Sequence, residues 1–313
     1  MKQRYVAVCI LSAMATVASA ADPQLLKLVM PDAKVVSGID VDHVKTTPFG
    51  QFFLSQFLAD TGFKDLVNAT GFDPRRDVRE IVMASPGDPA RKAALLVVRG
   101  NFDTARLLPL VQASGAKIEN YHGIPLLAGK DKTAQATALI DNSTLVAGDI
   151  ESVRGAIDRR NGSIAISAEL SGKISQTSAN QDAWLVSTAP VSSFAAVAPE
   201  RNVRGALQGD VFKSIEQSSG AIRFGNVIEI SGELIARTNA DATSLADVLK
   251  FLSSMLQMNA PAGQAAQFAA LLQNLTVTAQ ANAVKFSILI PEVDFETALR
   301  LATSRVGART PKI

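Results

Sequence analysis

Asp40, Asp42 and His43 are the residues whose types and spacing most directly suggest chemistry. Carboxylates beside an imidazole can hold a divalent metal ion, or can serve as a general acid and base. A protein metal site usually needs three or four ligands, and the only other histidine of the chain is His122. The alternative interpretation is the polar face of a strand that runs into a loop. We therefore keep the three residues as metal candidates, while expecting neither a metal ion nor another cofactor.

Known catalytic motifs are weak or absent in the sequence. Ser114 and Lys117 have the Ser-x-x-Lys spacing of penicillin-recognising enzymes, but Gly115 breaks the helix that this chemistry requires. The chain has no Gly-x-Ser-x-Gly, His-Glu-x-x-His, Walker or Gly-x-Gly-x-x-Gly pattern. The sequence therefore identifies no catalytic residue, and it favours a protein that is not an enzyme.

The first twenty residues have the pattern of an export signal. Lys2 and Arg4 form a positive start, residues 5–17 are uncharged and mostly apolar, and Ala18-Ser19-Ala20 has the small residues that a signal peptidase recognises. A membrane-spanning helix is the weaker alternative because the apolar run is short. We expect cleavage after Ala20 and a periplasmic or extracellular protein.

Removing this signal changes the chemistry of the chain. Its only cysteine, Cys9, lies in the signal, so the mature protein can form no disulfide and carries no thiol. The full chain has 31 Lys and Arg against 29 Asp and Glu, and loss of Lys2 and Arg4 makes it formally neutral. A neutral chain has no overall field to attract polyanions, so we expect no nucleic-acid binding.

The hydrophobic pattern of the first half predicts alternating strands and helices. Apolar residues at every second position indicate strands, and apolar residues three or four positions apart indicate helices. Pro86-Gly87-Asp88-Pro89 is a turn signal and predicts a hairpin between its flanking runs. The predicted strands are 34–41, 78–85, 93–99, 117–121, 125–128, 134–140 and 144–148, and the predicted helices are 49–58, 63–70, 104–113 and 151–160.

The second half has a similar order of elements. Ala183–Thr188 is predicted as a strand, followed by helices near 192–197 and 210–218. Two hairpins are predicted, and the second turns at Asn282. The hairpin strands are 221–230 with 232–237 and 275–280 with 284–290, and the later helices are 244–258 and 292 to about 305.

This order predicts an internal duplication. The first half spans residues 21–161, a connecting segment with a helix at 168–178 spans 162–181, and the second half spans 182–313. Residue identity between the halves is poor, so the prediction rests on element order alone, and chance agreement is the alternative.

The predicted fold class is α+β. Several hairpins favour antiparallel sheets, or one continuous sheet, with helices packed on one face. A parallel α/β fold is the alternative, and the lack of a glycine-rich turn from strand to helix argues against it.

Two further segments attract attention. Gly71-Phe72-Asp73-Pro74-Arg75-Arg76-Asp77 is dense in charge, and we expect Asp73 to cap a turn while the arginines pair with Asp77 and Glu80. Phe251, Met255 and Met258 add apolar bulk to the helix 244–258, and methionine-rich faces adapt to partners. We keep these three as a candidate interaction surface; packing within a helical hairpin is the alternative.

Pro31-Asp32-Ala33, Pro48-Phe49-Gly50-Gln51 and the segment 71–77 are short motifs within the stretches 25–44, 48–56, 71–80 and 228–250. In these stretches the chain resembles uncharacterised bacterial secreted proteins of unknown function, of the acidobacterial type. The resemblance implies export and an α+β fold, and it brings no activity.

The leading hypothesis is an exported, non-catalytic binding protein of the cell envelope. Its expected partner is an envelope protein or a small apolar ligand, with no nucleic acid and no membrane span after cleavage. The sequence leaves its oligomeric state open. The alternative is a secreted hydrolase that works through carboxylate or serine residues. Two close carboxylates in a pocket would favour the hydrolase, whereas an apolar groove without convergent polar groups would favour binding.

Overall fold

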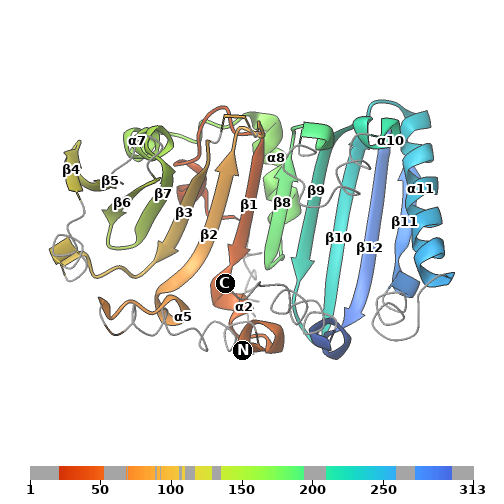
Figure 1. Cartoon of the computed structure of the whole chain (residues 1–313), viewed down its shortest axis with the longest axis horizontal. Helices are drawn as coiled ribbons and strands as arrows, with labels where there is room; N and C mark the ends of the chain where they lie inside the picture. The colour runs from red at the N-terminus through yellow and green to blue at the C-terminus, as the bar shows by residue number, and fades with distance from the viewer. Residues whose placement is uncertain are drawn as a thin grey trace, which may run out of the picture.

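Twelve strands of the described chain pair edge to edge into one antiparallel sheet (Figure 1). The computed structural model describes residues 21–52, 68, 70–88, 90, 91, 93–105, 108, 109, 117–128, 135–193, 209–258 and 272–297. The order across the sheet is β11-β12-β10-β9-β8-β1-β2-β3-β7-β6-β5-β4. The antiparallel α+β class that the hairpins predicted is therefore confirmed.

The described strands and helices have the following bounds. The strands are β1 (Val35–Asp40), β2 (Val78–Ser85), β3 (Leu95–Gly100), β4 (Lys117–Tyr121), β5 (Ile124–Ala128), β6 (Gln135–Asp141), β7 (Thr144–Asp149), β8 (Ala183–Ser187), β9 (Ile215–Arg223), β10 (Val227–Ala236), β11 (Thr276–Gln280) and β12 (Ala283–Pro291). The helices are α1 (Pro23–Leu26), α2 (Val41–Val44), α5 (Pro74–Asp77), α7 (Ile150–Arg159), α8 (Ala168–Ser178), α10 (Asp210–Lys213), α11 (Asn239–Met258) and the short 3₁₀ turn η2 (Leu272–Asn274).

The main core lies on one face of the sheet. Alternation along β2 turns Val82 and Ala84 inward, and β8 turns Trp184 and Val186 to the same side. Residues of α1, α7 and α8 join them in one buried cluster, and the fully buried members from these helices are Leu25, Val153, Ala156, Ile157, Leu170 and Ile174. These helices therefore cover one face of the first half and of the centre.

Helix α11 packs on the other face, at the far end of the sheet. Its Leu245 forms a second buried cluster with Val284 of β12, against which Leu234 of β10 packs. Strand register places Leu234 opposite Ser218, which in turn lies opposite Ser187 of β8. Residues opposite each other in register share a face, so α11 and α8 lie on opposite faces of the sheet.

Both halves of the sheet read in a similar order from the central pair β1 and β8. On one side the order is β1-β2-β3-β7-β6, and on the other it is β8-β9-β10-β12-β11. The β4–β5 hairpin extends the first side only. The duplication, with halves 21–161 and 182–313, stays a prediction; superposition of strands 35–149 on strands 183–291 is its test.

Three sequence expectations were wrong. Helices pack on both faces of the sheet and not on one, because α11 lies on the face opposite α7 and α8. The predicted hairpin of 221–230 with 232–237 is replaced by β9 and β10, which turn at Phe224-Gly225-Asn226. Gly232 lies inside β10, where a Cβ atom would meet the Phe286 ring at 2.4 Å, so this glycine serves packing and not a turn. The predicted helix 210–218 ends at Lys213, because Ile215 begins β9 and buries its side chain.

Other predictions fall outside the described residues. They include the signal segment 1–20, most of the helices 49–58, 63–70, 104–113 and 192–197, and the end of the last helix. Residues 48–52 and 292–297 are helical as expected. In the described ranges, no helix combines the length and the apolar character needed to cross a membrane.

Candidate functional site: an apolar groove at the centre of the sheet

The candidate site is a row of side chains that crosses five strands. In register, Leu185 of β8 lies opposite Ser37 of β1, Ser37 opposite Met83 of β2, Met83 opposite Leu96 of β3, and Leu96 opposite Ala147 of β7. Because opposite residues share a face, all five side chains lie on the face away from the main core.

Size differences along this row produce a groove. Met83 is 51% exposed and Leu185 is 43% exposed, while the smaller Ser37 lies between them. The groove has a volume of about 410 Å³. We call it the central groove, and its lining comprises Val35, Ser37, Met83, Ala84, Ser85, Ala94, Leu95, Leu96, Gln135, Ala147, Gly148 and Leu185.

The lining suits apolar contact and no acid–base chemistry. None of the described lining residues is titratable, and its polar side chains are Ser37, Ser85 and Gln135. Among the described helices, α11 lies on this face at the far end of the sheet, where it packs on β10, β11 and β12. Exposed apolar area of this kind gains free energy when a ligand removes it from water.

The metal candidates do not converge. Asp40 caps α2 by accepting the His43 backbone N–H at 3.0 Å, and Asp42 pairs with Lys45 at 2.6 Å. The Nδ1 of His43 lies 2.5 Å from Oδ1 of Asp182. No group of three or more potential ligand side chains gathers within the described residues. Metal binding by the three candidates stays untested.

A separate pocket of about 200 Å³ gathers carboxylates beside the end of β1. Asp40 and Glu80 lie opposite each other on β1 and β2, and both line this pocket with Arg99, Ser178 and five other residues. Burial, together with the nearby carboxylates of Asp22 and Asp40, raises the pKa of Glu80 to about 7. We call it the Glu80 pocket.

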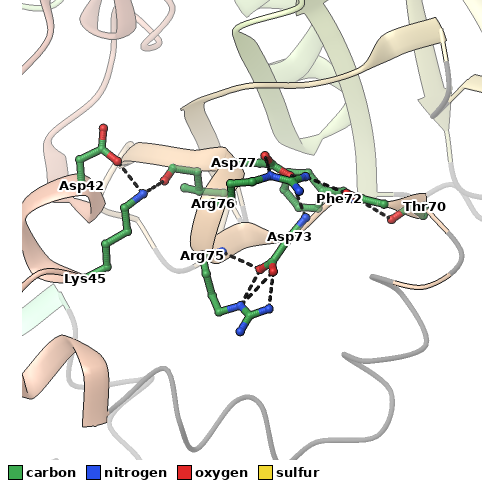
Figure 2. Close-up of polar contacts among 10 residues, drawn as sticks. Asp42, Lys45, Thr70, Phe72, Asp73, Arg75, Arg76 and Asp77 are labelled. Atoms are coloured by element: carbon green, nitrogen blue, oxygen red, sulfur yellow. Dashed lines mark hydrogen bonds and ion pairs between the residues drawn. The ribbon is translucent and has the colours of Figure 1, made fainter.

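The charged segment 71–77 neutralises itself, as Figure 2 shows. Asp73 accepts the backbone N–H of Arg75 at 3.0 Å and also pairs with the Arg75 side chain, while Asp77 accepts from Arg76 at 2.7 Å. The guanidinium groups hold the pKa values of Asp73 and Asp77 below their usual range. The predicted cap and the Arg76–Asp77 pair are confirmed, but Glu80 pairs with neither arginine.

The candidate surface on α11 is exposed where the structure describes it. Phe251 is 62% exposed and Met255 is 41% exposed, and Leu252 beside them is 38% exposed. The side chain of Met258 lies outside the described residues. A role of this surface in binding a partner stays a prediction.

A serine- and threonine-lined cleft of about 360 Å³ lies on β9, β10, β11 and β12, on the face of the sheet opposite α11. A Glu233–Lys285 ion pair of 3.5 Å crosses it, and Ser219, Ser231 and Ser287 are among its lining residues. Neither His43 nor His122 lines it. The cleft therefore holds no Ser–His pair, and its charged lining residues Glu233 and Lys285 pair with each other.

Sequence reasoning missed both the central groove and the Glu80 pocket. A signal for the groove was present: Met83 and Leu185 are large apolar residues at the outward positions of alternating strands. Met83 and Leu185 are 185 − 83 = 102 positions apart, and they meet only because β1 pairs with both β2 and β8, which no local pattern predicts.

Comparison with known proteins identifies no family. No protein-family model matches the chain, and no curated protein matches it. Among solved structures, the chain is similar to crystal form I of TP0453. The match covers 90% of this chain and 98% of the TP0453 chain, with a TM-score of 0.49 and 12% sequence identity. The resemblance to acidobacterial secreted proteins stays a prediction.

Proposed function

We propose that the protein is an exported, non-catalytic binding protein whose central groove holds a small, uncharged apolar ligand. The observation that supports this is the row of Leu185, Ser37 and Met83, which leaves two large apolar side chains exposed around a small one. Export follows from the signal pattern of residues 1–20 and is part of the proposal.

The dimensions favour a small ligand over a protein partner. Small-molecule sites have volumes of about 300–1,000 Å³, and the groove, at about 410 Å³, lies within that range. A stable protein interface buries about 800 Å² on each partner, and it centres on aromatic or arginine anchors. The described lining contains neither residue class.

The test is direct binding of a neutral apolar dye, N-phenyl-1-naphthylamine, followed by its fluorescence. We expect saturable binding that 1-dodecanol displaces, and at least about tenfold weaker binding when Met83 and Leu185 are both replaced by threonine. Val227→Thr is the matched control, because Val227 is 50% exposed and lies away from the groove.

A secreted hydrolase is the second candidate, and the Glu80 pocket is the observation in its favour. Glu80 with a pKa of about 7 could donate a proton while the opposite Asp40 accepts one. A broad ester and glycoside screen in which Glu80→Gln removes activity would support this function. Equal activity in the Glu80→Gln variant would exclude this pocket as its site.

A further inference from the structure

We propose that the Glu80 pocket is the docking site for the α-ammonium group of Ala21, which signal cleavage after Ala20 creates. The proposal rests on the predicted cleavage and is independent of ligand binding in the central groove.

The starting point is the position of the Ala21 nitrogen. Ala21 is buried, at 8% exposure, and its N–H donates to the hydroxyl of the fully buried Ser178 at 3.1 Å. Ala21 and Ser178 both line the Glu80 pocket. The nitrogen of Ala21, the residue that follows the expected cleavage point, is thus bonded to the last residue of α8.

Two of the cations around the pocket are already paired with carboxylates other than Glu80. Asp22, Asp40, Asp42 and Glu80 supply the carboxylates, and Arg79, Arg99 and Lys45 supply the cations among the described residues. Arg99 is held by Asp22 at 2.6 Å, and Lys45 is held by Asp42 at 2.6 Å. Asp182, farther along the chain, is paired with His43. Within the described part of the chain, no cation lies within 4 Å of the Glu80 carboxylate.

Glu80 is therefore the pocket carboxylate to which a further cation would bind. It lies opposite Asp40 in the sheet, and like charges directly opposite are destabilising. Its Oε1 accepts the Asp22 backbone N–H at 3.1 Å. Glu80 lines the same pocket as Ala21, and it already binds the backbone N–H of Asp22, the residue that follows Ala21.

An unsatisfied acceptor lies in the same place. Gln181 lines the pocket, and its buried Oε1 has no hydrogen-bond partner among the described residues. A buried polar atom left unpaired costs about 1–3 kcal/mol. The peptide nitrogen of Ala21 has one hydrogen and gives it to Ser178, so the uncut chain has none left for Gln181 or Glu80.

Cleavage supplies what is missing. Water adds across the Ala20–Ala21 bond, Ala20 leaves as a carboxylate, and the Ala21 nitrogen gains protons to become an ammonium group. Its three N–H donors can serve Ser178, Gln181 and Glu80 together, and its charge pairs with the Glu80 carboxylate. Removal of the signal thereby completes the packing of the N-terminus between α8 and β2. An ammonium group bound here also occupies the Glu80–Asp40 pair, which leaves no free acid and base.

Four proteins test the proposal: the processed chain purified after export, the same chain with Gly-Ser placed before Ala21, processed Glu80→Gln, and processed Glu216→Gln as the control. Intact mass establishes each N-terminus. Trace acetylation across a pH series, read at Ala21 by mass spectrometry, gives the α-amine pKa. Trp184, the only tryptophan, lines the pocket and reports its occupation by fluorescence.

We expect the processed α-amine to have a pKa about one unit above its ordinary 7.7–8.0, which slows its acetylation about fivefold at pH 8 and about tenfold at pH 6.5. Glu80→Gln returns it to the ordinary value, and the exposed control Glu216→Gln does not. We expect the fluorescence emission of Trp184 to differ between the chain with Gly-Ser before Ala21 and the processed chain. An ordinary α-amine pKa in the processed protein, an N-terminus other than Ala21, or equal emission from processed and extended chains would overturn the proposal. The comparison of processed and extended chains needs no substitution at Glu80.

Discussion

Met83 and Leu185 lie in one row across the sheet, on the two strands that flank β1, with Ser37 between them. Both side chains are about half exposed, although their strand neighbours Val82, Ala84, Trp184 and Val186 are buried on the opposite face. The centre of the sheet is thus apolar on both sides. One side is the core, and the other side is the surface to which we assign ligand binding.

Gly38 and Gly172 should respond oppositely to alanine. A Cβ atom at Gly38 would lie 2.5 Å from the Trp184 ring, so Gly38→Ala should destabilise the protein by about 1–3 kcal/mol and alter Trp184 fluorescence. Gly172 is exposed within α8 and a Cβ atom there meets nothing within 4 Å, so Gly172→Ala should stabilise by about 0.5–1 kcal/mol. Urea unfolding measures both; equal effects would contradict the packing of Trp184 on Gly38.

Asp182 should contribute more to stability than its partner His43. Asp182 is buried and accepts the Phe224 backbone N–H at 2.6 Å as well as contacting His43. Asp182→Ala leaves that N–H unpaired and should cost about 1–3 kcal/mol. The side chain of His43 is 54% exposed, so His43→Ala should cost less. A larger loss from His43→Ala, measured by denaturant unfolding, would be inconsistent with this role of Asp182.

The Arg76–Asp77 pair should make stability fall in acid. Hydrogen bonds from Arg76 lower the pKa of Asp77, so its contribution is present above about pH 3.9 and is lost as the pH falls through the lowered pKa. Asp77→Asn should therefore destabilise by on the order of 1 kcal/mol at pH 7, with a difference from wild type that shrinks below pH 3.9. Thermal unfolding at pH 7 and pH 3 checks this. A difference that grows in acid would refute it.

Glu80 should have the opposite pH dependence in the chain that carries residues before Ala21. Its folded pKa of about 7 lies above the ordinary glutamate value of about 4.3, so the folded state binds more protons between these values. Stability from this group is then full below about pH 4.3 and is lost as the pH rises toward 7. Glu80→Gln should flatten that decline, and Glu216→Gln should leave it in place. The measurement is urea unfolding from pH 4 to pH 8.

Local elements were predictable where the pattern was local. The strand 78–85 and the helix 168–178 have the predicted bounds, because period-two alternation and the Ser167 cap lie within the segments themselves. The hairpin around Asn282 was also predicted, since its turn interrupts two apolar runs.

Interactions between distant segments were not predictable. Gly232 resembles a turn in the sequence, but its lack of a side chain accommodates the Phe286 ring, which comes from another strand. The Glu80 pocket joins residues 21, 40, 80, 99 and 178, whose spacing gives no motif. Asp40, Asp42 and His43 show that neighbours in sequence need not form one site. Each of the three side chains bonds a different partner.

Ligand binding at the central groove is tested most directly by titrating the protein with N-phenyl-1-naphthylamine before and after Met83→Thr and Leu185→Thr are combined. Threonine keeps strand propensity, so the free energy of unfolding should change little, which the same samples show by urea unfolding. We predict at least about tenfold weaker dye binding in the double variant and unchanged binding in Val227→Thr. Equal affinity in wild type and the double variant, with both folded, would contradict the assignment of the groove.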